Sequence, residues 1–373
     1  LPRRLRESRR MTGGSPSGAE SGRLRARPVE GLVAVEMPRE FQPRRLVRRA
    51  IPVLAALTVL GLVVVLAPGL GEVRERLGDA DPGWLALAVL FEALSGVSYV
   101  LMFRPIFCRQ MPWRTSWEIS WSSLAVGSIV PASGAGGLAL GAWILHEGGM
   151  PADRIARRSV AFFLIKSSVN FVAVAVLGTL LAVGLVGPEL SLWLTAAPAA
   201  AAVVLIAAVV TVPHLGPGPP PPPDAGKLRR GLASARRALV SGTAEAIVLL
   251  RTRDRMMLLG ALGYWAWDNA VLWATFQAFD SSPALSVILM GYLIGQLGGL
   301  LPLPGGVGGI DGGLIGTLVV FGTPAATTAA AVLAYRVILF WLPLVVGGIA
   351  FAFLRRALNR ADRPELCVVP AAS

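Results

Sequence analysis

Long apolar runs alternate with short polar segments along most of this chain. Each of six runs is close to the roughly 20 apolar residues that cross a bilayer as one helix. These runs are residues 50–70, 83–107, 159–184, 189–212, 256–279 and 325–354. The pattern predicts an all-α polytopic membrane protein with about six full spans.

Two further apolar stretches are each interrupted by glycine and proline. Residues 116–146 break at 131–137, and residues 284–321 break at 302–313. Neither piece of such a stretch can cross alone, because a helix of about 15 residues covers only about 22 Å of a hydrocarbon core about 30 Å thick. We therefore expect two broken, re-entrant helical hairpins.

The two breaks resemble each other and lie 173 positions apart. The matched positions are Pro131 with Pro304, Gly136 with Gly309, Gly149 with Gly322, and Pro151 with Pro324. Broken helices at matching places in two halves of a membrane protein are typical of transport sites, because unwound backbone there can bind a polar ligand. The pattern predicts an internal repeat.

Composition agrees with a membrane location. Hydrophobic residues make up 54% of the 373, charged residues only 15%, and the mean hydropathy is +0.63. Most of the basic residues behind the net charge of +13 lie outside the apolar runs. Such a distribution indicates positive-inside topology, and nucleic acid is not an expected partner.

Loop charges orient the predicted spans. The linker after the first span is acidic, whereas arginines flank the 116–146 hairpin and follow the last span. The stretch around the 284–321 hairpin has no basic residue. We expect the first hairpin to enter from the cytoplasm and the second from outside, as an inverted-topology repeat with both termini cytoplasmic.

The same features predict five regions. They are a disordered basic cytoplasmic arm (1–49), a first membrane half (50–212), a proline-rich linker with a basic interfacial helix (213–255), a second membrane half (256–354) and a cytoplasmic tail (355–373). The basic helix is expected either on anionic lipid headgroups or as a solvated cytoplasmic helix.

An acidic and a basic residue in the second half form the first candidate site. An ionised aspartate at the bilayer centre costs about 2.5–3.5 kcal/mol, so Asp311 needs a partner, and Arg336 on the next span is the expected one. The pair could bind substrate, or it could be a structural ion pair that fixes the hairpin against the last span.

The residues of the two breaks form the second candidate site. Glycines let backbone N–H groups approach an anion closely, but small residues also allow close packing of membrane helices. Both interpretations stay open. The substrate-binding candidates here are Pro131, Gly136, Gly137, Pro304, Gly305, Gly306, Gly308 and Gly309.

Polar residues inside other spans complete the candidates. Lys166 and Asn170 lie four positions apart on one helix face, and Lys166 provides a cation behind the first hairpin. Glu92 and Asp268 lie in the middle of their spans and could relay a proton. They could equally be structural acids that pair with Lys166 or Arg336.

The second half carries a motif order that resembles a known family. Residues 302–314 read Pro-Leu-Pro-Gly-Gly-Val-Gly-Gly-Ile-Asp-Gly-Gly-Leu, followed by Gly-Thr-Pro at 322–324 and Ala-Tyr-Arg at 334–336. This order resembles the lysylphosphatidylglycerol synthase transmembrane-region family over about residues 45 to 355. The family usually has Glu where Asp311 stands.

The resemblance implies a multi-pass protein of the bacterial cytoplasmic (inner) membrane that acts as a lipid flippase. About 20 residues follow the last predicted span, so the soluble aminoacyl-transfer domain of full-length synthases is not expected. We expect no enzyme, cofactor or metal. Membrane lipids, anionic ones first, are the expected partners, and a lipid-modifying enzyme partner and a homo-oligomer stay open. The alternatives are a non-transporting scaffold or accessory subunit, and an ion-coupled carrier of small solutes.

Overall fold

A computed structural model describes residues 45–48, 50–51, 55, 58, 71–129, 135–188, 191–216, 218–219, 226–296 and 309–358. All of these residues belong to one compact unit, Met37–Ser373.

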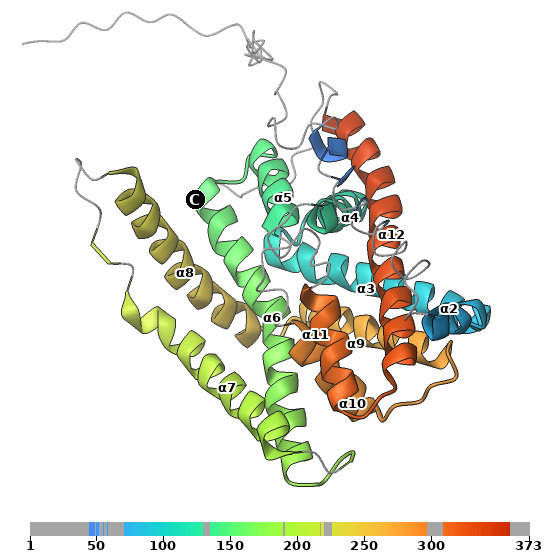
Figure 1. Ribbon diagram of the computed structural model, residues 1–373. Helices are drawn as coiled ribbons and strands as arrows, with labels where there is room; N and C mark the ends of the chain where they lie inside the picture. The colour runs from blue at the N-terminus through green and yellow to red at the C-terminus, as the bar shows by residue number, and fades with distance from the viewer. Residues whose placement is uncertain are drawn as a thin grey trace, which may run out of the picture. The chain divides into compact units, whose positions relative to one another are not determined.

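The described residues form helices joined by short turns, without any strand among them (Figure 1). In chain order the helices are α2 (Gly71–Gly78), α3 (Pro82–Phe107), α4 (Trp113–Ile129), α5 (Ala135–Glu147), α6 (Ala152–Ala182), α7 (Leu192–Thr211), the 3-10 helix η3 (Val212–Leu215), α8 (Lys227–Arg251), α9 (Arg255–Gln277), α10 (Leu285–Gly295), α11 (Gly309–Val320) and α12 (Ala325–Leu358). The expected all-α class is confirmed.

Four described helices are long and apolar enough to cross a membrane. They are Pro82–Phe107, Ala152–Ala182, Leu192–Leu215 and Ala325–Arg356. The predicted span at 50–70 lies almost entirely outside the described residues, and the one at 256–279 corresponds to α9, whose middle carries polar residues. The total of six spans stays a prediction.

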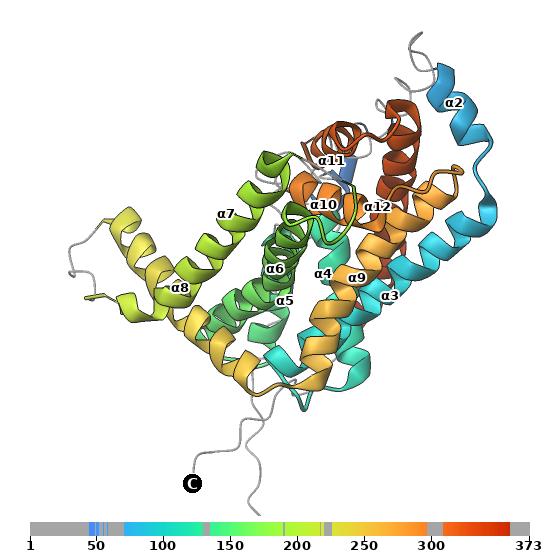
Figure 2. The same ribbon diagram turned by 90° about the horizontal axis from the view of Figure 1, so that it is seen from below.

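Helices α3 and α9 lie side by side, and no other pair of helices in the described part packs more extensively (Figure 2). A methyl group added at Gly260 of α9 would lie 2.7 Å from the Ser98 carbonyl oxygen and 2.5 Å from the Met102 nitrogen of α3. Close approach of this kind is typical of small residues at membrane helix interfaces. The rings of Phe91 and Trp267 stack across the same interface, with centroids 5.5 Å apart.

Each predicted hairpin is present as a pair of packed helices. α4 packs on α5, and α10 packs on α11. Helix α12 contacts both pairs. Its Gly347 lies against the backbone of Trp121 on α4, and its Arg336 pairs with Asp311 on α11. In Figure 1 the two pairs therefore lie toward opposite ends of α12.

The turns after the two hairpins have the same backbone conformation. Gly149 and Gly322 both adopt positive φ, +86° and +93°, which glycine accepts without steric cost. The residue after each glycine donates a backbone hydrogen bond five positions back. Met150 N–H bonds to the Leu145 carbonyl at 3.0 Å, and Thr323 N–H bonds to the Leu318 carbonyl at 3.1 Å. These turns are 173 positions apart and end their helices with Schellman-type bonds.

The same offset relates the starts of α3 and α9. The side chain of Asp81 accepts a hydrogen bond from the Gly83 N–H at 2.6 Å, and that of Asp254 accepts one from the Met257 N–H at 3.1 Å. Both aspartates cap a helix N-terminus. The shared caps and turns support an internal repeat, while its inverted orientation in the membrane stays a prediction.

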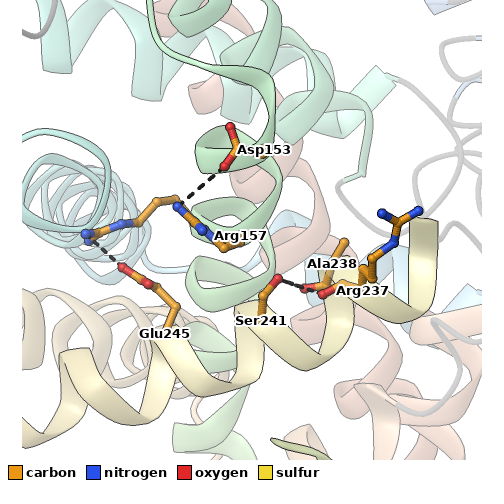
Figure 3. A network of polar contacts seen from close by, with 7 residues as sticks. Asp153, Arg157, Arg237, Ala238, Ser241 and Glu245 are labelled. Carbon is orange, nitrogen blue, oxygen red and sulfur yellow. Dashed lines mark hydrogen bonds and ion pairs between the residues drawn. The ribbon is translucent and has the colours of Figure 1, made fainter. Parts of the chain in front are cut away.

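The basic helix between the membrane halves is α8, and it packs against α6. Glu245 of α8 reaches across to α6 and pairs with Arg158 at 2.8 Å (Figure 3). Toward its start, α8 exposes Leu228, Leu232 and Leu239 on one face, with exposed fractions of 79%, 63% and 47%. The C-terminal part of α8 is therefore held by α6, while an apolar stripe remains uncovered nearer the N-terminus.

The α3–α9 contact generates a stability prediction. Gly260→Ala should destabilise the protein by about 1–3 kcal/mol, because overpacking forces the two backbones apart. Gly348→Ala on α12 is the matched control, since no described atom lies within 4 Å of the added methyl group. The midpoint of thermal denaturation of purified protein should fall only for Gly260→Ala, and equal midpoints for the two variants would contradict the close approach.

Candidate functional site

The predicted pairing of Asp311 with Arg336 is present. The Nε and Nη2 atoms of Arg336 lie 2.6 Å and 2.5 Å from the Oδ1 atom of Asp311. Only 12% of the arginine side chain and 9% of the aspartate side chain are exposed. Asp311 lies in the first turn of α11, where the helix dipole favours a negative charge. The pair thus joins the second hairpin to the middle of α12.

A second buried carboxylate connects α9 and α10 to the helix of Arg336 through hydrogen bonds. Asp268 of α9 accepts a hydrogen bond at Oδ2 from the hydroxyl of Tyr292 on α10, and one at Oδ1 from the hydroxyl of Tyr335 on α12 at 3.0 Å. Tyr335 directly precedes Arg336. Helix α12 therefore presents one side chain to α9 and the next to α11, and two carboxylates hold the helices of the second half together.

The first half contributes a cation to the same cluster. Lys166 of α6 lies with its ammonium group 5.5 Å from the ring centroid of Tyr264, within the range of a cation–π contact. Asp268 attracts Lys166 electrostatically, and it also attracts Arg336. The two cations that were predicted behind separate hairpins therefore share one carboxylate.

Glu92 brings a third carboxyl group from α3. It is buried, with 7% exposed, and it lies next to Phe91, whose ring stacks on Trp267, the residue that precedes Asp268 on α9. Ionised carboxylates at these two positions repel each other electrostatically. The two predicted relay residues are thus brought together. Asn170 is half-buried on α6, and its Oδ1 atom has no hydrogen-bond partner within the described part of the chain.

Sequence reasoning missed the tyrosines. The chain has only four, and all of them, Tyr99, Tyr264, Tyr292 and Tyr335, interact with this cluster or with one another. Tyrosine in membrane proteins usually lies at the water interface, so four tyrosines in the middle of apolar helices were a usable signal. Their hydroxyl groups are hydrogen-bond donors that a buried carboxylate needs.

The glycines of the first break favour the packing interpretation. A methyl group at Gly137 would collide with the carbonyl group of Ser123 on α4, so the two helices of the hairpin touch at this point. Gly136 beside it is buried, and Gly309 begins α11. The remaining predicted residues of the breaks lie outside the described residues, and they are Pro131, Pro304, Gly305, Gly306 and Gly308.

The cluster is asymmetric between the halves. At the 173-residue offset, Leu138 takes the place of Asp311, and Phe163 takes the place of Arg336. In the first half the charges come instead from Glu92 and Lys166. No group of three or more His, Cys, Asp or Glu side chains is arranged to hold a metal ion within the described residues. The charged residues of the cluster in one half are not related to those in the other half by the 173-residue offset.

The ion pair generates a prediction about stability. Arg336→Met should destabilise the protein by about 3–5 kcal/mol, because it leaves the Asp311 carboxylate buried without its partner. The double variant Asp311→Leu/Arg336→Met should recover most of that loss, since both charges are then gone. Thermal denaturation of the purified proteins measures both effects.

The matched control for this experiment is an exposed pair. Asp153 and Arg157 on α6 lie 3.6 Å apart with 74% and 42% of their side chains exposed, so Asp153→Asn should change stability little (Figure 3). A double variant no more stable than Arg336→Met alone would contradict the assigned pairing.

Comparison with known proteins agrees with this architecture. The family described as "Lysylphosphatidylglycerol synthase TM region" matches residues 53–347, more than half of the chain. Two relatives from Methanothermobacter thermautotrophicus are each named "UPF0104 membrane protein". One is 25% identical over 329 residues, which cover 82% of this chain and 96% of the relative. The other is 27% identical over 368 residues, which cover 88% and 100%.

The family match spans both hairpins, the buried charge cluster, three of the four helices that are long enough to cross a membrane, and the fourth as far as residue 347. The chain therefore belongs to the lysylphosphatidylglycerol synthase TM region family and is a multi-pass membrane protein.

Proposed function

We propose that this protein moves the polar headgroup of a membrane lipid between the two leaflets of the cytoplasmic membrane. The observation that carries the proposal is the buried cluster around Asp311 and Arg336, to which both halves contribute charges. Ionisable groups inside membrane segments are costly and usually mark substrate or ion pathways. Family membership supports the same function.

Arg336 is the residue proposed to bind the headgroup. Its guanidinium group offers several N–H donors in a planar fork that suits a phosphate oxygen pair. In the structure two of these donors contact one oxygen of Asp311. A lipid phosphate would take the place of that carboxylate, so the cation would never be left without an anion. Asp311 would then bind an ammonium group of the headgroup or a proton.

The surroundings of the cluster suit lipid tails. Helix α12 exposes apolar side chains on the face away from Arg336, and Val337, Trp341, Val345 and Ile349 are between 46% and 55% exposed. Exposed apolar surface of this extent is expected to face lipid acyl chains. The headgroup would thus move along a polar path inside the bundle while its tails remain in the bilayer.

Lipid movement in proteoliposomes tests the proposal. Purified protein should accelerate transfer of headgroup-labelled phosphatidylglycerol, or of its aminoacylated form, relative to empty liposomes. Arg336→Gln should lower the rate by about tenfold or more, since a hydrogen bond to a charged group contributes about 1.5–3 kcal/mol. Asp311→Glu, which restores the residue usual in the family, should retain transport.

Asp153→Asn is the control and should transport like the unsubstituted protein. A rate equal to that of empty liposomes for every lipid would refute lipid movement, and it would favour a scaffold or a carrier of small solutes. A folded Arg336→Gln variant with an unchanged rate would refute the assignment of the site.

Helix α8 is proposed to lie on the anionic headgroups of the cytoplasmic leaflet. The exposed Leu228, Leu232 and Leu239 share one face, and Arg230 and Arg237 lie on the opposite one. An apolar stripe opposite a basic face is typical of helices in the membrane interface. The salt bridge from Glu245 to Arg158 of α6 holds the other end of this helix (Figure 3).

Thiol labelling tests this position of α8. A polarity-sensitive fluorophore on Leu232→Cys should report an apolar environment in nanodiscs of anionic lipid, and the same fluorophore on Ser234→Cys should report water. The unsubstituted protein, which has two natural cysteines, provides the background signal. Equal exposure to water at both positions would show that α8 is a solvated helix.

A further inference from the structure

The buried charges of the cluster do not balance. Three carboxyl groups, Glu92, Asp268 and Asp311, accompany two cations, Lys166 and Arg336. If every group were ionised, the described cluster would carry one net negative charge inside the apolar part of the bundle. An unpaired buried charge costs several kcal/mol, and such a group normally takes up a proton instead.

Contacts within the cluster indicate which carboxyl group takes the proton. Arg336 is 2.5 Å from Asp311, so this pair is neutral. Asp268 accepts a tyrosine hydroxyl at each of its two oxygens, which is the acceptor-only pattern of an ionised carboxylate. Lys166 lies beside the helix of Asp268, with its ammonium group 5.5 Å from the ring centroid of Tyr264, and its charge offsets that of Asp268. The two cations therefore offset the charges of these two carboxylates.

Glu92 is the carboxyl group that remains. It is buried on α3 next to Phe91, whose ring stacks on Trp267 of α9, the residue that precedes Asp268. Asp268 repels Glu92 when both are ionised. Two carboxylates that share a buried site do not both ionise readily. The other groups around Asp268 are already accounted for, namely Tyr264 on its own helix, Tyr292 on α10, and Tyr335 and Arg336 on α12.

We propose that Glu92 is the proton-binding site that couples lipid movement to the proton gradient, an inference that rests on the proposed function. Protonation adds one hydrogen ion from water to a carboxylate oxygen and makes the cluster neutral. Deprotonation leaves it with one negative charge. An anionic headgroup enters the neutral form at lower cost, so the proton and the headgroup bind together. By linkage, each raises the affinity of the cluster for the other.

Infrared difference spectroscopy of the purified protein tests the proton directly, without any transport. The carboxylic-acid C=O band should be present at neutral pH and absent in Glu92→Gln. Glu118→Gln is the matched control, because Glu118 is also buried but pairs with Arg114 at 3.0 Å. The control should keep the band. A band of full intensity in Glu92→Gln would overturn the assignment.

A transport experiment then tests coupling. In proteoliposomes, an imposed pH gradient should accelerate movement of phosphatidylglycerol by the unsubstituted protein and by Glu118→Gln, and Glu92→Gln should lose this response. A response retained in Glu92→Gln would overturn the coupling. If no variant moves lipid, the proposed function fails, and the infrared result alone decides whether Glu92 holds a proton.

Discussion

Charge that is buried inside an apolar bundle must be paired, and this constraint organises the second half of the protein. Arg336 lies in the middle of α12, where water cannot solvate it, so α11 has to bring Asp311 within 2.6 Å. Tyr335, the preceding residue, meets Asp268 of α9, which in turn is bound by Tyr292 of α10. Four helices are therefore positioned by two carboxylates.

Close packing of backbones brings the first half to the same place. Gly260 lets α9 approach α3 at Ser98 and Met102, and this contact places Glu92 opposite Asp268. Lys166 of α6 completes the cluster. The second half has two carboxylates, Asp268 and Asp311, and one cation, Arg336, so Lys166 of the first half is needed to offset their charge. The cluster belongs to the interface of the halves.

Much of this fold follows from patterns that act along one helix at a time. The apolar run at 83–107 became α3, Pro82–Phe107, because the Asp81 cap and Pro82 fix its start. The predicted breaks at 131–137 and 302–313 are too long, because residues 135–137 belong to α5 and residues 309–313 belong to α11. Glycine continues a helix where it packs closely, as Gly137 does against Ser123. The rest of each predicted break lies outside the described residues. The partner of Asp311 was predictable because only one arginine lies on the following span.

Contacts between distant segments were not predictable in the same way. Tyr292 and Tyr335 are 24 and 67 positions from Asp268, and no periodicity along the chain relates them to it. Sequence reasoning therefore left open whether Asp268 and Glu92 pair with Lys166 or with Arg336. Gly137 similarly fits both an anion site and close packing until Ser123 is seen against it. Only the structure shows which of these groups lie close together, and so it decides between the interpretations that the sequence left open.

The contact between Asp311 and Arg336 fits a structural ion pair as well as the headgroup site that we propose. The most direct test exchanges the two charges in the variant Asp311→Arg/Arg336→Asp, with thermal stability and headgroup transfer measured on the same preparation. Because the exchanged pair can still form, stability should recover relative to either single change. Headgroup transfer should stay lost, since the cation has moved from α12 to the hairpin. Transfer at the unsubstituted rate would contradict the account and leave the pair a structural one.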